Sequence, residues 1–154
     1  MISKVLLSTF LAAANMQSVE IDASLHGYNL LWPSPRCCAF DLHVAPDGHA
    51  VVKTKINMGK RPKIWTSKFT LTPHQMLRIR DSVYEVGFFN LPDDICCGPM
   101  DGDERVITIA IGDRKHRVTF PDYVVSDQIN DLRRVDKLWM EIKSLVHIPG
   151  DNIR

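Results

Sequence analysis

The sequence lacks a hydrophobic run long enough to cross a membrane. A spanning helix needs about 20 consecutive apolar residues, and no stretch of these 154 residues reaches that length. A large excess of one charge is also missing, because 19 Lys and Arg residues oppose 18 Asp and Glu residues. The net charge of +1 creates no overall field toward nucleic acid or anionic lipid. We therefore expect no membrane span and no nucleic-acid partner.

The short motifs that mark nucleotide-binding, metalloprotease and serine-hydrolase sites are absent as well. The histidines do not gather in one segment; they are His26, His43, His49, His74, His116 and His147. We expect a protein without catalytic activity and without a cofactor. An enzyme whose site is assembled only in space stays an alternative, because catalytic groups need not be neighbours in sequence.

What the sequence does contain is the composition of one ordinary globular domain. Apolar residues make up 45% of the chain and charged residues 24%. No internal repeat, low-complexity tract or linker divides it. We therefore predict a single domain over residues 1–154.

Alternating apolar and polar residues predict the strands. From Cys38 to Val44 every second residue is apolar, which is typical of a half-buried strand. Pro46-Asp47-Gly48 then predicts a turn, since Pro fixes φ and Gly accepts a positive φ. The same reasoning gives six expected strands, at residues 18–23, 38–44, 50–56, 63–71, 105–111 and 116–120.

Two helices are expected beside these strands. Thr72, Pro73 and Gln75 form the pattern of a capping box with proline at the first helical position, and Gly87 is suited to end that helix. A second helix is expected from Ser126 to about residue 145, with a wide apolar stripe. The predicted class is α+β: a mainly antiparallel sheet of five or six strands, with two amphipathic helices packed on one face, in the order ββ(β)βα-ββα.

The cysteines come as two adjacent pairs, Cys37-Cys38 and Cys96-Cys97. A disulfide between neighbours strains the backbone, so we favour a bridge between the pairs, although the partners within this set stay open. Free buried thiols are one alternative. A zinc site of four thiolates is another, although zinc cysteines are usually separated by about two to four residues. A metal- or thiol-dependent binding protein is therefore a second hypothesis, and no metal site is assigned.

The first residues carry the parts of a secretory signal in the usual order. Lys4 is followed by an apolar stretch at residues 5–11 and by small residues at 12–14. On this interpretation residues 1–14 are a signal peptide and the protein is periplasmic or secreted. The alternative is a packed N-terminal helix of a cytoplasmic protein.

Charge is distributed in two blocks of opposite sign. Residues 48–80 contain eight Lys and Arg residues and no acidic residue, whereas residues 92–104 contain five acidic residues and no basic one. Solvated surfaces would explain both blocks, and the calcium-loop pattern is absent from the acidic one. The other interpretation is a protein-binding surface, whose candidate residues are Asp93, Asp94, Asp101, Asp103, Glu104, Lys60, Arg61, Lys63 and Trp65.

Two histidines flank the turn at residues 46–48. His43 shares a strand face with Asp41, and His49 follows the turn. A transition-metal site there would need both imidazoles on one face and a third ligand. Two exposed histidines of a hairpin are the simpler interpretation.

The order of these features is similar to that of small exported or lipid-anchored bacterial domains, over residues 33–146. The motifs that carry the resemblance are a Pro/Cys loop from Pro33 to Cys38, Asp47-Gly48, Phe88-Phe89-x-Leu91-Pro92, Asp101-Gly102, Ile107-x-Ile109-x-Ile111-Gly112 and His116-x-Val118. The chain also resembles, in type, the periplasmic immunity and inhibitor proteins. The resemblance implies a non-enzymatic binding module of the bacterial envelope that occludes a partner protein, such as a secreted effector or enzyme.

Overall fold

A computed structural model describes residues 18–26, 39–58, 61–95, 104–121 and 129–145 of the chain. The four cysteines and the expected leader at residues 1–14 lie outside these ranges, so both interpretations stay predictions. Within the described residues, no helix combines the length and the apolar character that crossing a membrane requires.

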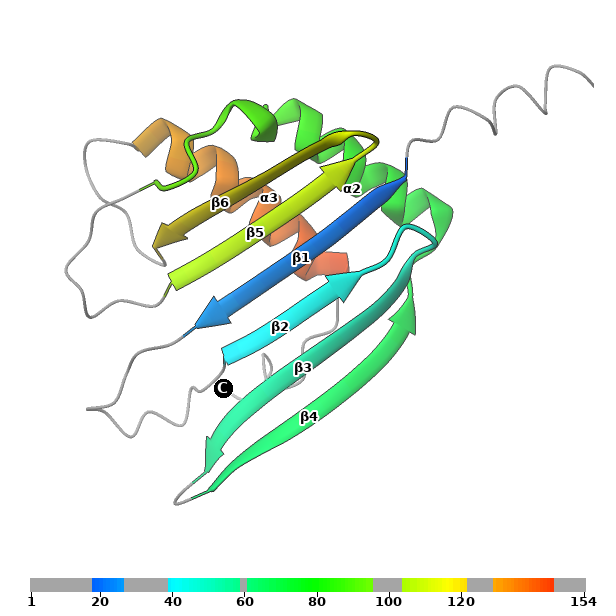
Figure 1. Cartoon of the computed structure of the whole chain (residues 1–154), viewed down its shortest axis with the longest axis vertical. Coiled ribbons are helices and arrows are strands. Elements are labelled where there is room, and N and C mark those ends of the chain that lie inside the picture. The colour runs from blue at the N-terminus through cyan, green and yellow to red at the C-terminus, as the bar shows by residue number, and fades with distance from the viewer. Residues whose placement is uncertain (1–17, 27–38, 59–60, 96–103, 122–128, 146–154) are drawn as a thin grey trace, which may run out of the picture.

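A six-stranded antiparallel sheet forms the body of the molecule (Figure 1). The expected α+β class, with a sheet of this size and two helices, is confirmed. The strand order is β4-β3-β2-β1-β5-β6. The strands are β1 (Val19–His26), β2 (Ala39–Val44), β3 (His49–Met58), β4 (Arg61–Thr70), β5 (Glu104–Ile111) and β6 (Arg114–Pro121).

Strand β1 lies in the middle of the sheet rather than at an edge. It pairs with β2 on one side, where Asp22 is opposite His43. It pairs with β5 on the other side, where Val19 is opposite Ile111. The first described strand therefore joins β2–β3–β4 to the hairpin β5–β6, and it leaves β4 and β6 as the two edges.

Local sequence explains where the helices begin and end. In α2 (Pro73–Glu85), Thr72 Oγ1 accepts the N–H of Gln75 at 3.2 Å, and the Gln75 side chain accepts the N–H of Thr72 at 2.8 Å. This is the expected capping box. Gly87 follows with φ 62° and leads into the short helix η1 (Phe88–Asn90). The last helix, α3, spans Ile129–Leu145.

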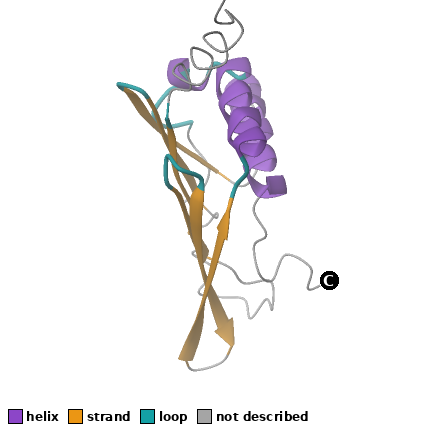
Figure 2. Cartoon of the chain, turned by 90° about the vertical axis from the view of Figure 1, so that its right-hand side faces the viewer, coloured by secondary structure: helices purple, strands orange, loops and turns teal. Residues whose placement is uncertain are grey.

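Both helices lie on the same side of the sheet (Figure 2). The core forms between them and every second residue of the strands. Trp139 of α3, which is 2% exposed, reaches across the sheet to Phe40 of β2 at 5.4 Å and Phe120 of β6 at 5.8 Å between ring centroids. Each large apolar side chain buried in this way stabilises the fold by about 1.5–3 kcal/mol.

The hairpin β3–β4 is longer than its sequence pattern indicates. Its pairing runs from His49 opposite Thr70 to Met58 opposite Arg61, and it extends beyond the helices (Figure 2). The expected strand begins at residue 63, whereas β4 begins at Arg61 and includes Pro62. An edge strand tolerates proline because one of its sides needs no ladder hydrogen bonds.

Candidate functional site

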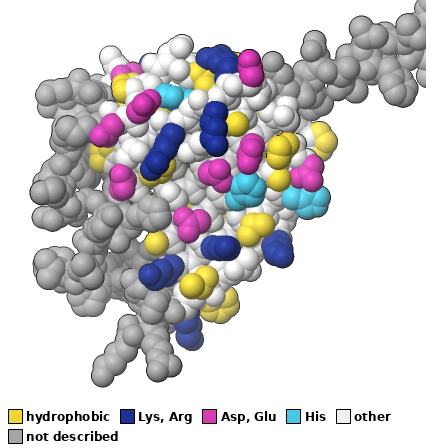
Figure 3. All heavy atoms as spheres, in the orientation of Figure 1, with side chains coloured by type: hydrophobic (Ala, Val, Ile, Leu, Met, Phe, Trp, Pro, Cys, Tyr) yellow, Lys and Arg dark blue, Asp and Glu magenta, His cyan; other side chains and the backbone are white. Residues whose placement is uncertain are grey.

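The face of the sheet that is turned away from the helices carries a mixture of polar and charged side chains (Figure 3). The period of two sends apolar side chains to the core and their neighbours to this uncovered face. Strand register aligns these neighbours in rows across the sheet. The row through the centre consists of Lys68, Val51, His43, Asp22, Thr108 and Arg117.

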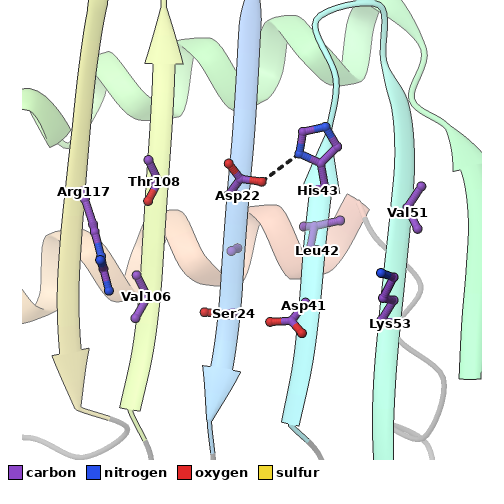
Figure 4. A pocket seen from close by; sticks show the side chains of 11 residues that line it. Asp22, Ser24, Asp41, Leu42, His43, Val51, Lys53, Val106, Thr108 and Arg117 are labelled. Atoms are coloured by element: carbon purple, nitrogen blue, oxygen red, sulfur yellow. Dashed lines mark hydrogen bonds and ion pairs between the residues drawn. The ribbon is translucent and has the colours of Figure 1, made fainter. Parts of the chain in front are cut away.

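A hollow of about 550 Å³ opens on this uncovered face. Its acidic and histidine side chains come from the central strands β1 and β2, while Lys53 of β3 and Arg117 of β6 lie on either side (Figure 4). The polar side chains that line it are Asp22, Ser24, Asp41, His43, Lys53, Thr108 and Arg117. The hollow thus offers charges of both signs to a partner.

The pair of Asp22 and His43 lines one end of the hollow, on the central strands β1 and β2 (Figure 4). His43 Nδ1 is 2.7 Å from Asp22 Oδ1, and the side chains are 48% and 55% exposed. Glu20 extends the pair to a group of three whose possible ligand atoms lie within 4.8 Å of one another. One nitrogen and two carboxylate donors suit a divalent cation chemically. Exposure to water and the mutual hydrogen bond equally suit a solvated ion pair.

The alternative of a metal site shared by His43 and His49 does not match this arrangement. His49 Nδ1 contacts Asp47 Oδ2 at 2.9 Å, whereas His43 contacts Asp22. Asp41, which shares the strand face of His43, is paired in register with Ser24 and Lys53. Each imidazole therefore has a different carboxylate partner, because the pairing of β1 with β2 brings Asp22 to His43.

The turn between β2 and β3 holds one carboxylate in its ionised form. The backbone N–H of His49 donates to Asp47 Oδ1 at 3.0 Å, and this bond lowers the pKa of Asp47 from its ordinary value of 3.8. The His49 side chain lowers the pKa of Asp47 further. In the same turn Gly48 has φ 87°, and its carbonyl accepts the N–H of Leu71 at 2.9 Å. The turn is thereby attached to the end of β4.

The edge strand β4 displays two large apolar side chains. Ile64 is 68% exposed and Trp65 is 54% exposed. Trp65 is opposite the buried Thr54, so it lies on the helix side of the sheet, while Ile64 is opposite Lys55 on the uncovered face. Both side chains are more than half exposed, and they lie on the edge strand of the sheet.

The surroundings of these apolar side chains are basic. Residues 49–70, which span both strands of the hairpin, contain no acidic residue. The described exposed cations are Lys53, Lys55, Lys63 and Lys68. Most of the basic block at residues 48–80 is therefore one hairpin at one edge of the sheet, and its last two cations, Arg78 and Arg80, lie on α2.

The opposite edge, β6, is closed by a segment of the chain. The Thr119 N–H donates to the Asp93 carbonyl at 2.8 Å, and the Ile95 N–H donates to the Thr119 carbonyl at 2.9 Å. These bonds form a parallel bridge between Asp94 and Thr119. Ile95 is 1% exposed, so the segment also contributes a side chain to the core.

The structure separates the predicted acidic residues from the basic ones. Asp93 and Asp94 are exposed beside β6, and Glu104 begins β5, whereas Lys63 and Trp65 lie on β4. Arg61 is also on β4, and Lys60, Asp101 and Asp103 lie outside the described residues. Five strand spacings, about 24 Å in all, separate the two edges. The described candidates therefore belong to two surfaces rather than one.

Comparison of the sequence with protein-family models and with curated proteins finds no match. Function is therefore inferred from the exposed side chains on the surfaces of the sheet. Sequence reasoning did not find the pair of Asp22 and His43, nor the row that ends at Arg117. A signal was present, because Glu20, Asp22 and Ser24 alternate with apolar residues. Only the strand register shows which residues of β2 and β5 lie beside this polar face of β1.

Proposed function

We propose that this protein is a non-enzymatic protein-binding module whose contact surface is centred on the hairpin β3–β4. One observation carries the proposal: Ile64 and Trp65 are adjacent, more than half exposed, and on opposite faces of an edge strand. An edge strand with a large exposed apolar side chain on each face offers apolar contacts to a chain that pairs along it. Tryptophan in particular is enriched among the residues that dominate binding energy.

The uncovered face of the sheet adjoins this hairpin and supports the same proposal. Lys53 belongs both to the hairpin and to the lining of the hollow. Aspartates, Lys53 and Arg117 in the hollow give a partner charges of both signs to match. Such complementarity acts mainly on the association rate and on the choice of partner.

Within this proposal we assign the module to the inhibitor or immunity type, in the periplasm or outside the cell. The resemblance of residues 33–146 to such domains supports this class. A hairpin that projects beyond the body of the molecule has a suitable shape for entering a concave site of another protein (Figure 2). Its mechanism would be occlusion, with the rigid sheet holding the hairpin in place.

The test is photo-crosslinking in cells of the protein's own host. A photoreactive residue at the exposed position Thr66, beside Trp65, should capture one defined protein. The same residue at Met140, a 56% exposed position on α3, is the matched control and should not capture it. Equal capture at both positions, or none at Thr66, would contradict the proposal.

Affinity for the captured protein then tests the contribution of the apolar pair. We expect Trp65→Ala to weaken binding by about 30-fold, corresponding to about 2 kcal/mol for a central interface residue. Met140→Ala should leave the dissociation constant unchanged. Equal dissociation constants for the two variants would remove Trp65 from the contact surface.

A further inference from the structure

Along the outer side of β4, none of the described segments of the chain pairs with the backbone. All ten residues of β4 pair with β3 on the inner side. The sheet order ends at β4, whereas the other terminal strand, β6, pairs outward with residues 93–95. An edge strand carries outward-pointing N–H and C=O groups that can pair with another extended chain.

The charge on this edge selects which chains can approach. Natural proteins protect edge strands with lysine and proline, and β4 has Pro62, Lys63 and Lys68. This protection acts against a second copy of the same strand, since two basic edges repel each other. Against an acidic strand it has the opposite effect, because the same lysines then attract the incoming chain.

We infer that β4 binds an acidic, extended segment of a partner protein, which adds to the sheet as a further strand. The inference rests on the proposed function, since it names the part of the partner that the hairpin recognises. Addition of a strand to an exposed edge is an established mode of peptide recognition, in which backbone bonds provide affinity and alternate side chains provide specificity.

The residues of β4 define what the added strand should contain. On the helix side, Lys63 and Trp65 are neighbours at a spacing of two, while Ile64 and Lys68 lie on the uncovered face. Strand pairing is stabilised where directly opposed residues of neighbouring strands carry opposite charges or are both apolar. The complementary order opposite residues 63–68 is therefore acidic, apolar, apolar, any, any, acidic.

The experiment uses the full chain and blocked synthetic peptides of ten residues, the length of β4. The main probe carries Glu-Thr-Thr-Val-Ile-Glu at its centre, which gives this order opposite residues 63–68 when the peptide runs antiparallel to β4. One control replaces both Glu residues by Lys. A second carries N-methyl groups on every other residue, at the backbone N–H groups that would face β4, and so loses these hydrogen bonds but keeps the charge. Binding is followed by calorimetry, and the site is located by amide chemical shifts.

We expect the acidic peptide to bind with shifts along β4, and each control peptide to bind at least about tenfold more weakly. In the protein, Lys68→Glu should weaken binding of the acidic peptide by about tenfold. Lys115→Glu makes the same change in net charge on the exposed surface of β6 and should leave binding unchanged.

Four results would overturn the inference. Equal binding of the acidic and basic peptides would remove charge selection, and equal binding of the N-methylated peptide would remove strand addition. Tighter binding of an oligothymidylate would assign the basic hairpin to nucleic acid instead. If the peptides fail while position 66 still crosslinks a protein, this inference falls and the proposed function stands.

Discussion

The two edges of the sheet differ in whether their outward backbone N–H and C=O groups are paired. At β6, the backbone of residues 93–95 pairs with Thr119, and the side chain of Ile95 enters the core. At β4, the outer backbone has no such partner among the described residues, and Ile64 and Trp65 are exposed. The β6 edge is paired at Thr119 with another segment of the chain, whereas the β4 edge is protected by Pro62 and by its positive charge. A charge can be matched by a partner, so the second edge is the one suited to binding.

The chain path explains why only one edge is closed. After α2 the chain turns at Gly87, forms η1, and passes along β6 before the next strands begin. His116 of β6 fixes this passage, because its Nε2 lies 2.9 Å from the Leu91 carbonyl and its ring meets Phe88 edge to face. After β4, by contrast, the chain proceeds directly into α2 at Pro73.

The difference between the two edges is tested most strongly by replacing one isoleucine at each edge with alanine. Ile95→Ala should lower the free energy of unfolding by about 2–4 kcal/mol, because it leaves a cavity in the core. Ile64→Ala removes the same atoms from a 68% exposed position and should change it by less than about 0.5 kcal/mol. Urea unfolding of both variants measures the difference. Similar losses would mean that the two edges are equally ordered.

Hydrogen exchange compares the backbones of the edges directly. The amides of Thr119 and Ile95 donate hydrogen bonds at the β6 edge and should exchange slowly. Every second amide of β4 points away from β3 and should exchange roughly a hundredfold faster or more. Amide-resolved exchange by NMR is the measurement. Uniform protection along β4 would show that its outer side is already occupied.

The turn at Gly48 attaches the open edge to the rest of the sheet. A Cβ at Gly48 would lie 2.6 Å from the Leu71 carbonyl oxygen, and the residue has φ 87°. Gly48→Ala should therefore lower the free energy of unfolding by about 2 kcal/mol or more. Gly112→Ala, at φ 61° in the hairpin β5–β6, is the control for the cost of backbone conformation alone. A smaller loss at Gly48 than at Gly112 would contradict the steric argument.

The smallest expected effect concerns the titration of Asp47 in that turn. Its pKa is lowered chiefly by the backbone N–H of His49, so His49→Ala should leave it below the ordinary value of 3.8. A depressed folded pKa favours the folded state above the unfolded pKa, and this contribution is lost as the pH falls through the folded value. Carboxyl NMR titration measures it. A return of the pKa to 3.8 in this variant would assign the shift to the imidazole.

Features that depend on a few consecutive residues could be predicted from the sequence. The capping box at Thr72 and the left-handed Gly87 follow from local chemistry, and the structure has both. The six strands follow from alternation, with ends that differ by up to three residues. These patterns are local, since each residue type acts on its own backbone or on the next turn.

Features that depend on which strands become neighbours could not be predicted. The place of β1 in the middle of the sheet is set by pairing between distant segments, so the contact of Asp22 with His43 had no local signal. In the sequence, residues 92–104 are distinguished only by their five acidic residues. Ile95, the apolar residue next to Asp93 and Asp94, was the one indication that part of this segment enters the core.

The central place of β1 has a consequence for how the molecule folds. The hairpins β3–β4 and β5–β6 need only nearby residues, but β1 pairs Val19 with Ile111, across most of the described chain. Closing so long a loop costs entropy before any pairing is gained, and sheets rich in such contacts fold slowly. Until β5 has been synthesised, β1 lacks its second neighbour, so the backbone N–H and C=O groups on that side have no strand to pair with. The sheet is therefore completed late in folding.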